Sequence, residues 1–191
     1  HVVLSAAPAA LGARDAIDTG VKVEFPGTAA PSLAGMPSLG RYRELARYMQ
    51  RFDLLLSYNW GSMDGVMART VMGSFSKLPP LIHHEDGFNE DEIDGLMPKR
   101  NWFRAIALRG SFATVVPSIT LADIAKRAWH RSEKAIHRIP NGIDIPRYLN
   151  AGDVTVFPGF SKADGEVVVG TIAGLRPVKN LTRLVRAVAA A

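Results

Sequence analysis

Short apolar segments alternate with amphipathic segments along most of this chain of 191 residues. The apolar segments are rich in Val, Ile and Leu, as strands buried in a parallel sheet are. Those expected to form strands are residues 21–25, 53–58, 81–84, 113–117, 135–139 and 166–172. Between them, helical spacing of apolar residues predicts helices over 39–51, 62–72, 99–109 and 120–129, and a last helix from about residue 180.

This repetition of strand and helix predicts an α/β fold with a Rossmann-like, doubly wound parallel sheet. Ser118 precedes the helix at 120–129 and can cap it, because its hydroxyl oxygen can accept a hydrogen bond from a backbone N–H of the first turn. Residues 6–34 are rich in Ala, Pro and Gly and predict no clear element.

Composition narrows the class of protein. With 47% hydrophobic and 21% charged residues, the chain resembles globular proteins and not disordered ones. It has no cysteine, which excludes a disulfide scaffold or a thiolate metal site and is compatible with a reducing cytoplasm. The net charge of +5 suits anionic partners such as nucleotide diphosphates or acidic lipids. Nucleic acid is not an expected partner, because no dense basic stripe with interleaved aromatic residues is present.

Two segments near the end of the chain carry the most specific pattern. Residues 139–144 read Ile-Pro-Asn-Gly-Ile-Asp, and residues 170–180 read GTIAGLRPVKN. Together they resemble the junction between the two halves of a family 4 glycosyltransferase of the GT-B architecture. In that family such a phrase closes the N-terminal domain, and a lysine follows in the first loop of the nucleotide-sugar domain. Lys179 stands at the position of that lysine.

The resemblance implies a division into domains. We expect residues 1–145 to form the N-terminal, acceptor-side Rossmann-like domain, incomplete at its start because the chain opens on an apolar stretch at His1. Residues 146–165, with the turn-forming pairs Pro158-Gly159 and Asp164-Gly165, are expected to form a linker region. Residues 166–191 would begin a truncated nucleotide-sugar domain. On this interpretation the fragment alone is nearly inactive.

The resemblance also implies the chemistry of the donor side. The whole protein would move a sugar from a nucleotide-sugar donor to an acceptor with retention of anomeric configuration, the donor being a co-substrate and no further cofactor being needed. Arg176, Lys179 and Asn180 would hold the diphosphate near a helix N-terminus. Asn141 and Gly142 form a turn close to the donor. Many relatives have an arginine where this chain has Gly174, and Arg176 is the nearest substitute.

The acceptor side is expected where the strand at 53–58 ends. Ligands of open α/β sheets gather beyond the carboxyl ends of the strands, which is where Tyr58, Asn59 and Trp60 lie. The aromatic rings could stack on a sugar and Asn59 could bind a hydroxyl group. Alternatively, Trp60 covers the core and Asn59 is a turn residue.

The next strand ends in the densest group of ionisable residues, His-His-Glu-Asp before Gly87. In a strand, His83 and Glu85 share one face and His84 and Asp86 the other. Related glycosyltransferases usually place a histidine directly before this glycine, beside the acceptor, where this chain has Asp86. Asp86, His84 and Glu85 are therefore the candidate catalytic residues. A metal site is a weaker alternative, because the spacing matches no strong metal motif.

Residues 98–110 combine basic and aromatic residues in a helical pattern. The pattern favours a helix with its apolar face on the sheet and its arginines in water. Peripheral contact with the inner membrane face is the alternative, because relatives with lipid-linked acceptors often bind membranes. The acceptor itself could be a glycan, a lipid or a small molecule. Two other functions stay open, a GT-B nucleotide-sugar epimerase and a noncatalytic module that binds a nucleotide or a partner protein.

Overall fold

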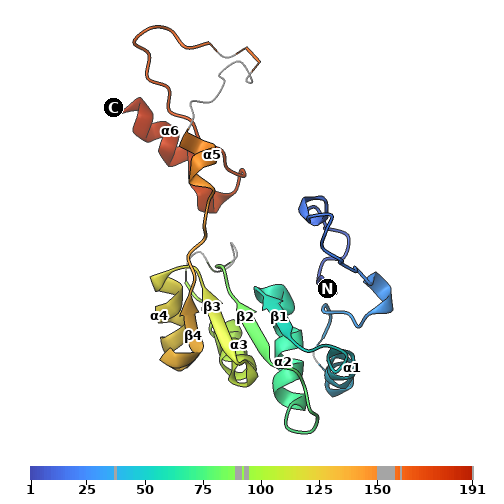
Figure 1. Ribbon diagram of the computed structural model, residues 1–191. Coiled ribbons are helices and arrows are strands. Elements are labelled where there is room, and N and C mark those ends of the chain that lie inside the picture. The colour runs from blue at the N-terminus through green and yellow to red at the C-terminus, as the bar shows by residue number, and fades with distance from the viewer. Residues whose placement is uncertain (37, 89–91, 93–94, 150–157, 160, 191) are drawn as a thin grey trace. The chain divides into compact units, whose positions relative to one another are not determined.

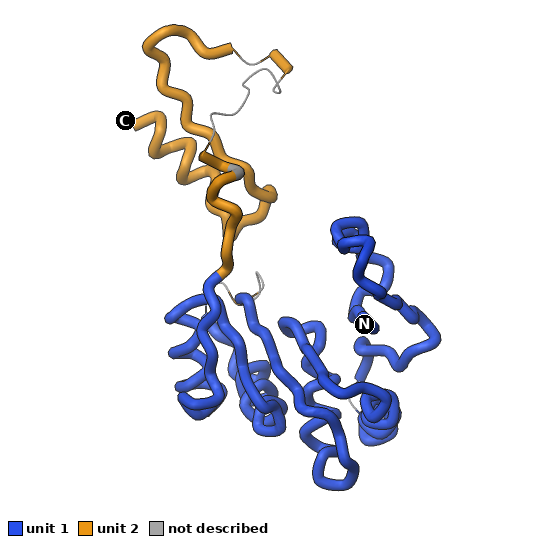
Figure 2. Tube along the Cα trace, in the orientation of Figure 1, with its two compact units in different colours: residues 1–87, 95–140 blue, residues 88–94, 141–191 orange. Residues whose placement is uncertain are grey.

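The computed structural model describes residues 1–36, 38–88, 92, 95–149, 158–159 and 161–190 (Figure 1). The chain divides into two compact units, residues 1–87 with 95–140 and residues 88–94 with 141–191 (Figure 2). The change of unit after Pro140 falls inside the segment 139–144 that resembles a domain junction. The assignment of 1–145, 146–165 and 166–191 to two domains and a linker stays a prediction.

The first unit is built on one parallel sheet, which confirms the predicted α/β, Rossmann-like class. Its four strands follow one another in the order β1-β2-β3-β4. They are β1 (Leu55–Tyr58), β2 (Leu81–His84), β3 (Ala113–Val116) and β4 (Ile136–Arg138). Tyr58 is in register with His84, and His84 with Val115, so the strands end together at one edge. Side chains that follow β1 and β2 therefore meet there.

Helices precede and connect these strands at nearly the predicted positions: α1 (Leu39–Met49) before β1, then α2 (Met63–Met72), α3 (Pro98–Ala107) and α4 (Ile119–Arg127) between successive strands. The Ser118 hydroxyl accepts a hydrogen bond from the Leu121 N–H at 3.1 Å, which confirms the predicted cap. Ser38 caps α1 in the same way through the Arg41 N–H. Pro98 begins α3, where a missing N–H costs nothing. No described helix is long and apolar enough to cross a membrane.

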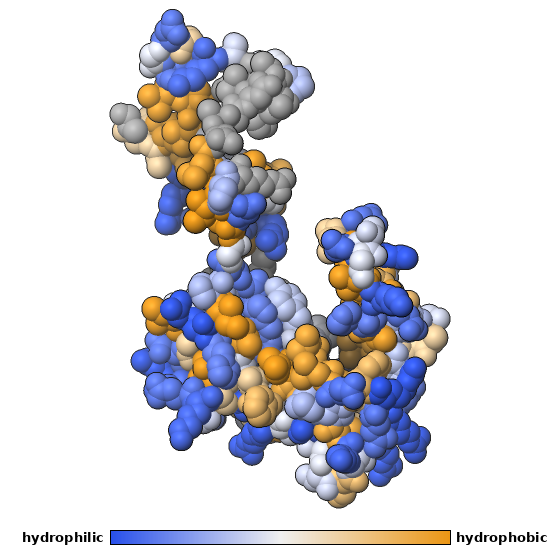
Figure 3. Space-filling model, in the orientation of Figure 1, coloured by the Kyte–Doolittle hydropathy of each residue, from blue (hydrophilic) through white to orange (hydrophobic). Residues whose placement is uncertain are grey.

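The three connecting helices, α2, α3 and α4, cover the same face of the sheet. Arg104 of α3 is hydrogen-bonded to Glu85, the residue that follows β2. Trp129, just after α4, donates a hydrogen bond to Asn101 of α3. This follows from the strand order, because right-handed connections that add each strand beside the last one place their helices on one side. On the other face Leu56 is 75% exposed, and Figure 3 shows hydrophobic side chains at the surface over the sheet.

Arg131 fastens the segment after α4 to the sheet. Its guanidinium donates hydrogen bonds to the carbonyl oxygens of Leu108 and Ser111 and to the Thr114 hydroxyl, at 2.5, 3.1 and 3.1 Å. Burial lowers the pKa of this guanidinium, although these acceptors still favour its charged form. The contact ties the segment that precedes β4 to β3 and to the turn before β3.

A close approach between α2 and the end of α3 fixes their packing. The Thr70 hydroxyl donates a hydrogen bond to the Ala107 carbonyl and accepts one from the Gly110 N–H. A Cβ atom at Gly110 would lie 2.3 Å from the Thr70 hydroxyl oxygen and 2.9 Å from the Thr70 Cα. Only glycine fits between these two segments.

Gly110→Ala is therefore expected to lower the free energy of unfolding by about 1–3 kcal/mol, as overpacking of a core does. Chemical denaturation of the two proteins measures the difference. Gly142→Ala is the matched control, because a Cβ atom there would meet nothing within 4 Å. Equal stability of Gly110→Ala and the unsubstituted chain would contradict this account of the packing.

The sequence prediction was wrong for two strands. Within 21–25, only Glu24 is bridged, in a single parallel pair with Val2. Residues 166–172 form no strand, and Val167 and Ile172 are 86% and 99% exposed. A parallel strand requires a neighbour to complete its hydrogen bonds, and among the described residues neither segment has one along its length.

The second unit contains α5 (Ile145–Leu149) and α6 (Leu181–Ala189). α6 begins where the last helix was predicted, whereas α5 was not predicted and reaches into the expected linker region. Pro158-Gly159 and Asp164-Gly165 are turns, as predicted, with positive φ at both glycines. Residues 150–157 and 160 of the expected linker lie outside the described residues.

Candidate functional site

Four polar residues from neighbouring strands meet at the carboxyl edge of the sheet, and we call them the polar corner: Tyr58, Asn59, His84 and Asp86. The Tyr58 hydroxyl donates a hydrogen bond to Asp86 Oδ2 at 3.0 Å. The Asp86 N–H donates one to Asn59 Oδ1 at 2.7 Å. The rings of Tyr58 and His84 meet edge to face, with centroids 5.1 Å apart. Predicted acceptor-binding and catalytic residues are thus in direct contact.

Asn59 shapes this corner through an unusual backbone conformation. Its φ of 52° and ψ of −172° turn the chain sharply from β1 toward α2. The turn is held by hydrogen bonds from the Asn59 N–H to the His84 carbonyl and from the Ser62 hydroxyl to the Asn59 carbonyl. Asn59 is therefore a turn residue, as one of the two interpretations expected, and its amide oxygen also orients Asp86. Strained backbone of this kind is often found at binding sites.

The Tyr58 hydroxyl stays protonated over the physiological pH range. Burial raises the pKa of Tyr58, and the hydrogen bond to Asp86 and the negative charge of Asp86 raise it further. The neutral phenol keeps donating to the carboxylate, because deprotonation would place two negative charges side by side. The ring is half exposed, so one side of it can contact a bound molecule.

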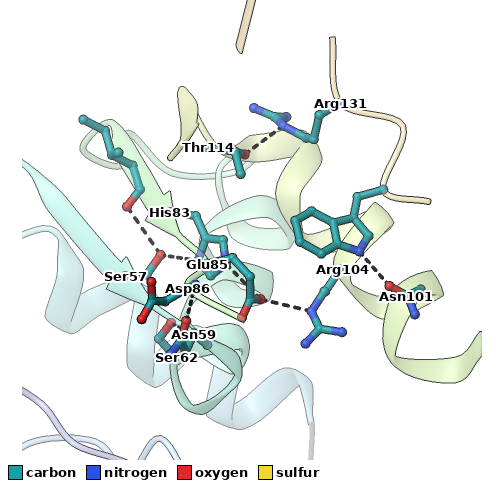
Figure 4. Close-up of polar contacts among 12 residues, drawn as sticks. Ser57, Asn59, Ser62, His83, Glu85, Asp86, Asn101, Arg104, Thr114 and Arg131 are labelled. Atoms are coloured by element: carbon teal, nitrogen blue, oxygen red, sulfur yellow. Dashed lines mark hydrogen bonds and ion pairs between the residues drawn. The ribbon is translucent and has the colours of Figure 1, made fainter. Parts of the chain in front are cut away.

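Beneath the polar corner, on the helix-covered face, lies a buried polar network (Figure 4). The Ser57 hydroxyl is hydrogen-bonded to His83 Nδ1 at 3.0 Å, and His83 Nε2 lies 3.7 Å from Glu85 Oε2. Arg104 Nε donates a hydrogen bond to the same Glu85 oxygen at 3.2 Å. The side chains of His83, Glu85 and Arg104 are all but inaccessible to solvent. Burying two charges costs free energy, and that cost is offset only by the opposite charge and the hydrogen bonds that surround them.

This burial changes the predicted role of Glu85. Glu85 was predicted as a catalytic candidate beside Asp86 and His84, but it faces α3 and is fully buried. A molecule at the polar corner cannot reach it, and we revise its role to one of packing. Asp86 and His84 lie on the opposite face, as strand alternation predicted.

Trp60 packs against α3. Its ring lies edge to face with Phe103, with centroids 5.8 Å apart. The guanidinium carbons of Arg100 and Arg104 lie 5.0 and 4.9 Å from its centroid. Arg104 also lies 5.6 Å from the centroid of the Trp129 ring. These contacts fit the interpretation in which Trp60 covers the core, and its contact with an acceptor stays a prediction.

No protein family model matches this sequence, and a search of curated proteins gives no significant match. The likeness to family 4 glycosyltransferases therefore rests on the segments 139–144 and 170–180 and on the order of strands and helices.

The residues expected at the donor belong to the second unit. Arg176, Lys179 and Asn180 lie together in one turn, where the Lys179 N–H donates a hydrogen bond to the Arg176 carbonyl at 2.9 Å. Asn180 adopts the left-handed conformation and directly precedes α6. Both basic side chains are exposed, so the turn presents two cations beside the first N–H groups of a helix. Asn141 and Gly142 are exposed in the segment that precedes α5.

Metal binding finds no support in this geometry. Strand alternation separates His83 and Glu85 from His84 and Asp86, so the four cannot converge on one ion. In the part of the chain that the structure describes, no three His, Asp or Glu side chains are grouped closely enough to hold a metal ion.

Arg104 belongs to the buried network, although the arginines of 98–110 were expected to lie in water. Its exposed fraction is 1%. The sequence contained a signal for this burial. Asn101, Arg104 and Leu108 are buried and follow the three- and four-residue spacing of one helix face. Glu85 was a second indication, because a carboxylate on a covered strand face requires a cation nearby. Ser57 and His83 complete the same network.

Proposed function

We propose that this chain is part of a retaining glycosyltransferase of the GT-B architecture, and that the polar corner belongs to its acceptor side. The observation that carries the proposal is the convergence of Tyr58, Asn59, His84 and Asp86 at the carboxyl edge of a parallel sheet, where open α/β proteins bind ligands. The segments 139–144 and 170–180 support it independently, because they resemble the domain junction of that family.

The polar corner offers the groups that a sugar or another hydroxyl-bearing acceptor requires. Asp86 is a fixed carboxylate that can accept a hydrogen bond or a proton from an attacking hydroxyl. The half-exposed Tyr58 ring provides a face for stacking, and His84 lies beside it. The acceptor hydroxyl forms the new bond to the anomeric carbon as the bond to the diphosphate breaks.

On the donor side, Lys179 and Arg176 would stabilise the negative charge that develops on the departing diphosphate. The first N–H groups of α6 add to this positive potential. The protein would act in the cytoplasm on a glycan or a lipid-linked acceptor, with peripheral contact to the inner membrane face in the lipid case. A nucleotide sugar is the co-substrate.

An Asp86→Asn substitution in the whole protein that contains this chain tests the role of the corner. We expect acceptor-dependent transfer to fall by about 10²–10⁴-fold, the usual contribution of a positioned acid or base. Slow hydrolysis of the donor by water should persist, because the donor side is unchanged. Both rates are measured from the release of nucleoside diphosphate, with and without acceptor.

Asp123→Asn is the matched control, since Asp123 is an exposed carboxylate in the middle of α4. It should leave both rates unchanged. Unaltered transfer by Asp86→Asn would remove the polar corner from the proposed acceptor side.

A further inference from the structure

A groove runs between α1 and α2, and no part of the proposed function uses it. It encloses about 480 Å³ and is lined by residues of α1, by the end of α2 and by the turn after it. α2 leads from the carboxyl end of β1 back to the start of β2, so its last residue, Met72, lies toward the amino edge of the sheet. The polar corner lies at the opposite edge. We call this surface the α1–α2 groove.

The groove has an apolar bed and an exposed apolar rim. Ala46 and Met72 are buried at its floor, beside Val71. Leu39 and Phe75 stand at its edges and are 61% and 81% exposed. Large apolar side chains around a concave apolar bed are typical of a surface that binds another molecule, because their exposure is otherwise unfavourable.

Two arginines give the groove a charge. Arg43 and Arg47 lie one helical turn apart on α1 and are exposed. Within the described residues, neither guanidinium forms an ion pair or a hydrogen bond. Arg41 on the same helix differs, since it contacts Asp64 at 2.6 Å and the carbonyl oxygens of Ser32 and Gly35. The groove therefore carries positive charge that the chain itself does not neutralise.

We propose that the α1–α2 groove docks an acidic amphipathic helix of a partner protein. A third helix fits between two helices because its apolar side chains fill the bed, as in other helix-in-groove complexes. Two carboxylates one turn apart on that helix would pair with Arg43 and Arg47 through charge-assisted hydrogen bonds. A bilayer surface suits the site less well, because a flat surface would touch the rim and leave the concave bed unfilled.

The test uses a fluorescein-labelled synthetic peptide of roughly 14 residues, about four helical turns, with leucines along one face and glutamates one turn apart. Fluorescence anisotropy measures its binding to the full chain. We expect saturable binding that weakens about tenfold or more in the Arg43→Glu, Arg47→Glu double variant, and by a similar factor in Phe75→Ser. A scrambled peptide of the same composition should bind at least about tenfold more weakly.

The matched control is the Arg109→Glu, Lys134→Glu double variant, which makes the same change of charge at exposed positions away from the groove. It should bind the peptide as the unsubstituted chain does. All substituted residues are exposed, so the melting temperatures should agree. If the charge reversals disturb folding, the proposal is judged on the binding of Phe75→Ser alone, because this substitution leaves the net charge unchanged.

The proposal would be overturned by the absence of saturable binding, by equal binding of the scrambled peptide, or by equal loss in the control variant. Unchanged binding by Phe75→Ser, or by a correctly folded Arg43→Glu, Arg47→Glu variant, would also overturn it. Phosphatidylglycerol vesicles provide the remaining comparison. Vesicle binding that requires Arg43 and Arg47 and displaces the peptide would assign the groove to a membrane instead. The proposal does not depend on sugar transfer, so neither its success nor its failure bears on the proposed enzyme activity.

Discussion

Arg104→Ala is expected to lower the free energy of unfolding by about 3–5 kcal/mol, the usual result of removing one partner from a buried ion pair. The substitution leaves Glu85 buried without its cation, and Glu85 Oε1 has no hydrogen-bond partner among the described residues. It also removes the contacts of the guanidinium with the rings of Trp60 and Trp129. Denaturant unfolding followed by far-UV circular dichroism measures the loss.

A double-mutant cycle separates the charge from the packing. Arg104→Met keeps most of the side-chain volume, and Glu85→Gln removes the negative charge that Arg104 balances. The double variant should be more stable than the sum of the two single losses predicts, because it leaves no unpaired charge. Arg109→Ala is the exposed control and should change stability by no more than about 0.5 kcal/mol. Additive losses in the cycle would show that the ion pair is not the reason for the effect.

Lys179→Ala in the whole protein is expected to lower kcat for sugar transfer by about 10²–10³-fold, the cost of removing one group that stabilises developing negative charge. The lysine would act mainly on the departing diphosphate, where charge builds up as the glycosidic bond breaks. Donor affinity should therefore change less than kcat. Steady-state kinetics with varied donor concentration separates the two quantities.

Two further substitutions sharpen this prediction. Lys162→Ala removes an exposed lysine of the same unit and should leave kcat unchanged. Arg176→Ala tests whether Arg176 replaces the arginine that many relatives have at the position of Gly174. If Arg176→Ala loses as much kcat as Lys179→Ala does, Arg176 also stabilises the departing diphosphate. Unchanged kcat in Lys179→Ala would contradict the donor-side assignment.

The sheet could be predicted from the sequence because each strand carries its own pattern. β2 has the predicted bounds, Leu81–His84, since a short apolar segment between Pro80 and the acidic residues leaves little choice. The alternation of faces then placed His84 and Asp86 on the same side before any contact was known. Tyr58 contacts Asp86 because the parallel register brings the ends of β1 and β2 together.

The features that were missed depend on neighbours that are distant in the sequence. Residues 166–172 have the pattern of a strand, but pattern alone does not supply the second strand that completes the hydrogen bonds. Arg104 is polar, and only the carboxylate of Glu85, on another element, explains why it is buried. The left-handed turn at Asn59 likewise depends on contacts with His84 and Ser62.

Sugar transfer by the whole protein can be tested by measuring the release of nucleoside diphosphate from a panel of nucleotide sugars, with and without candidate acceptors. We expect that at least one donor is turned over, that an acceptor accelerates the release, and that the sugar keeps its anomeric configuration in the product. Binding of nucleotides without any turnover across the panel would contradict this expectation, and would favour a noncatalytic nucleotide-binding module instead.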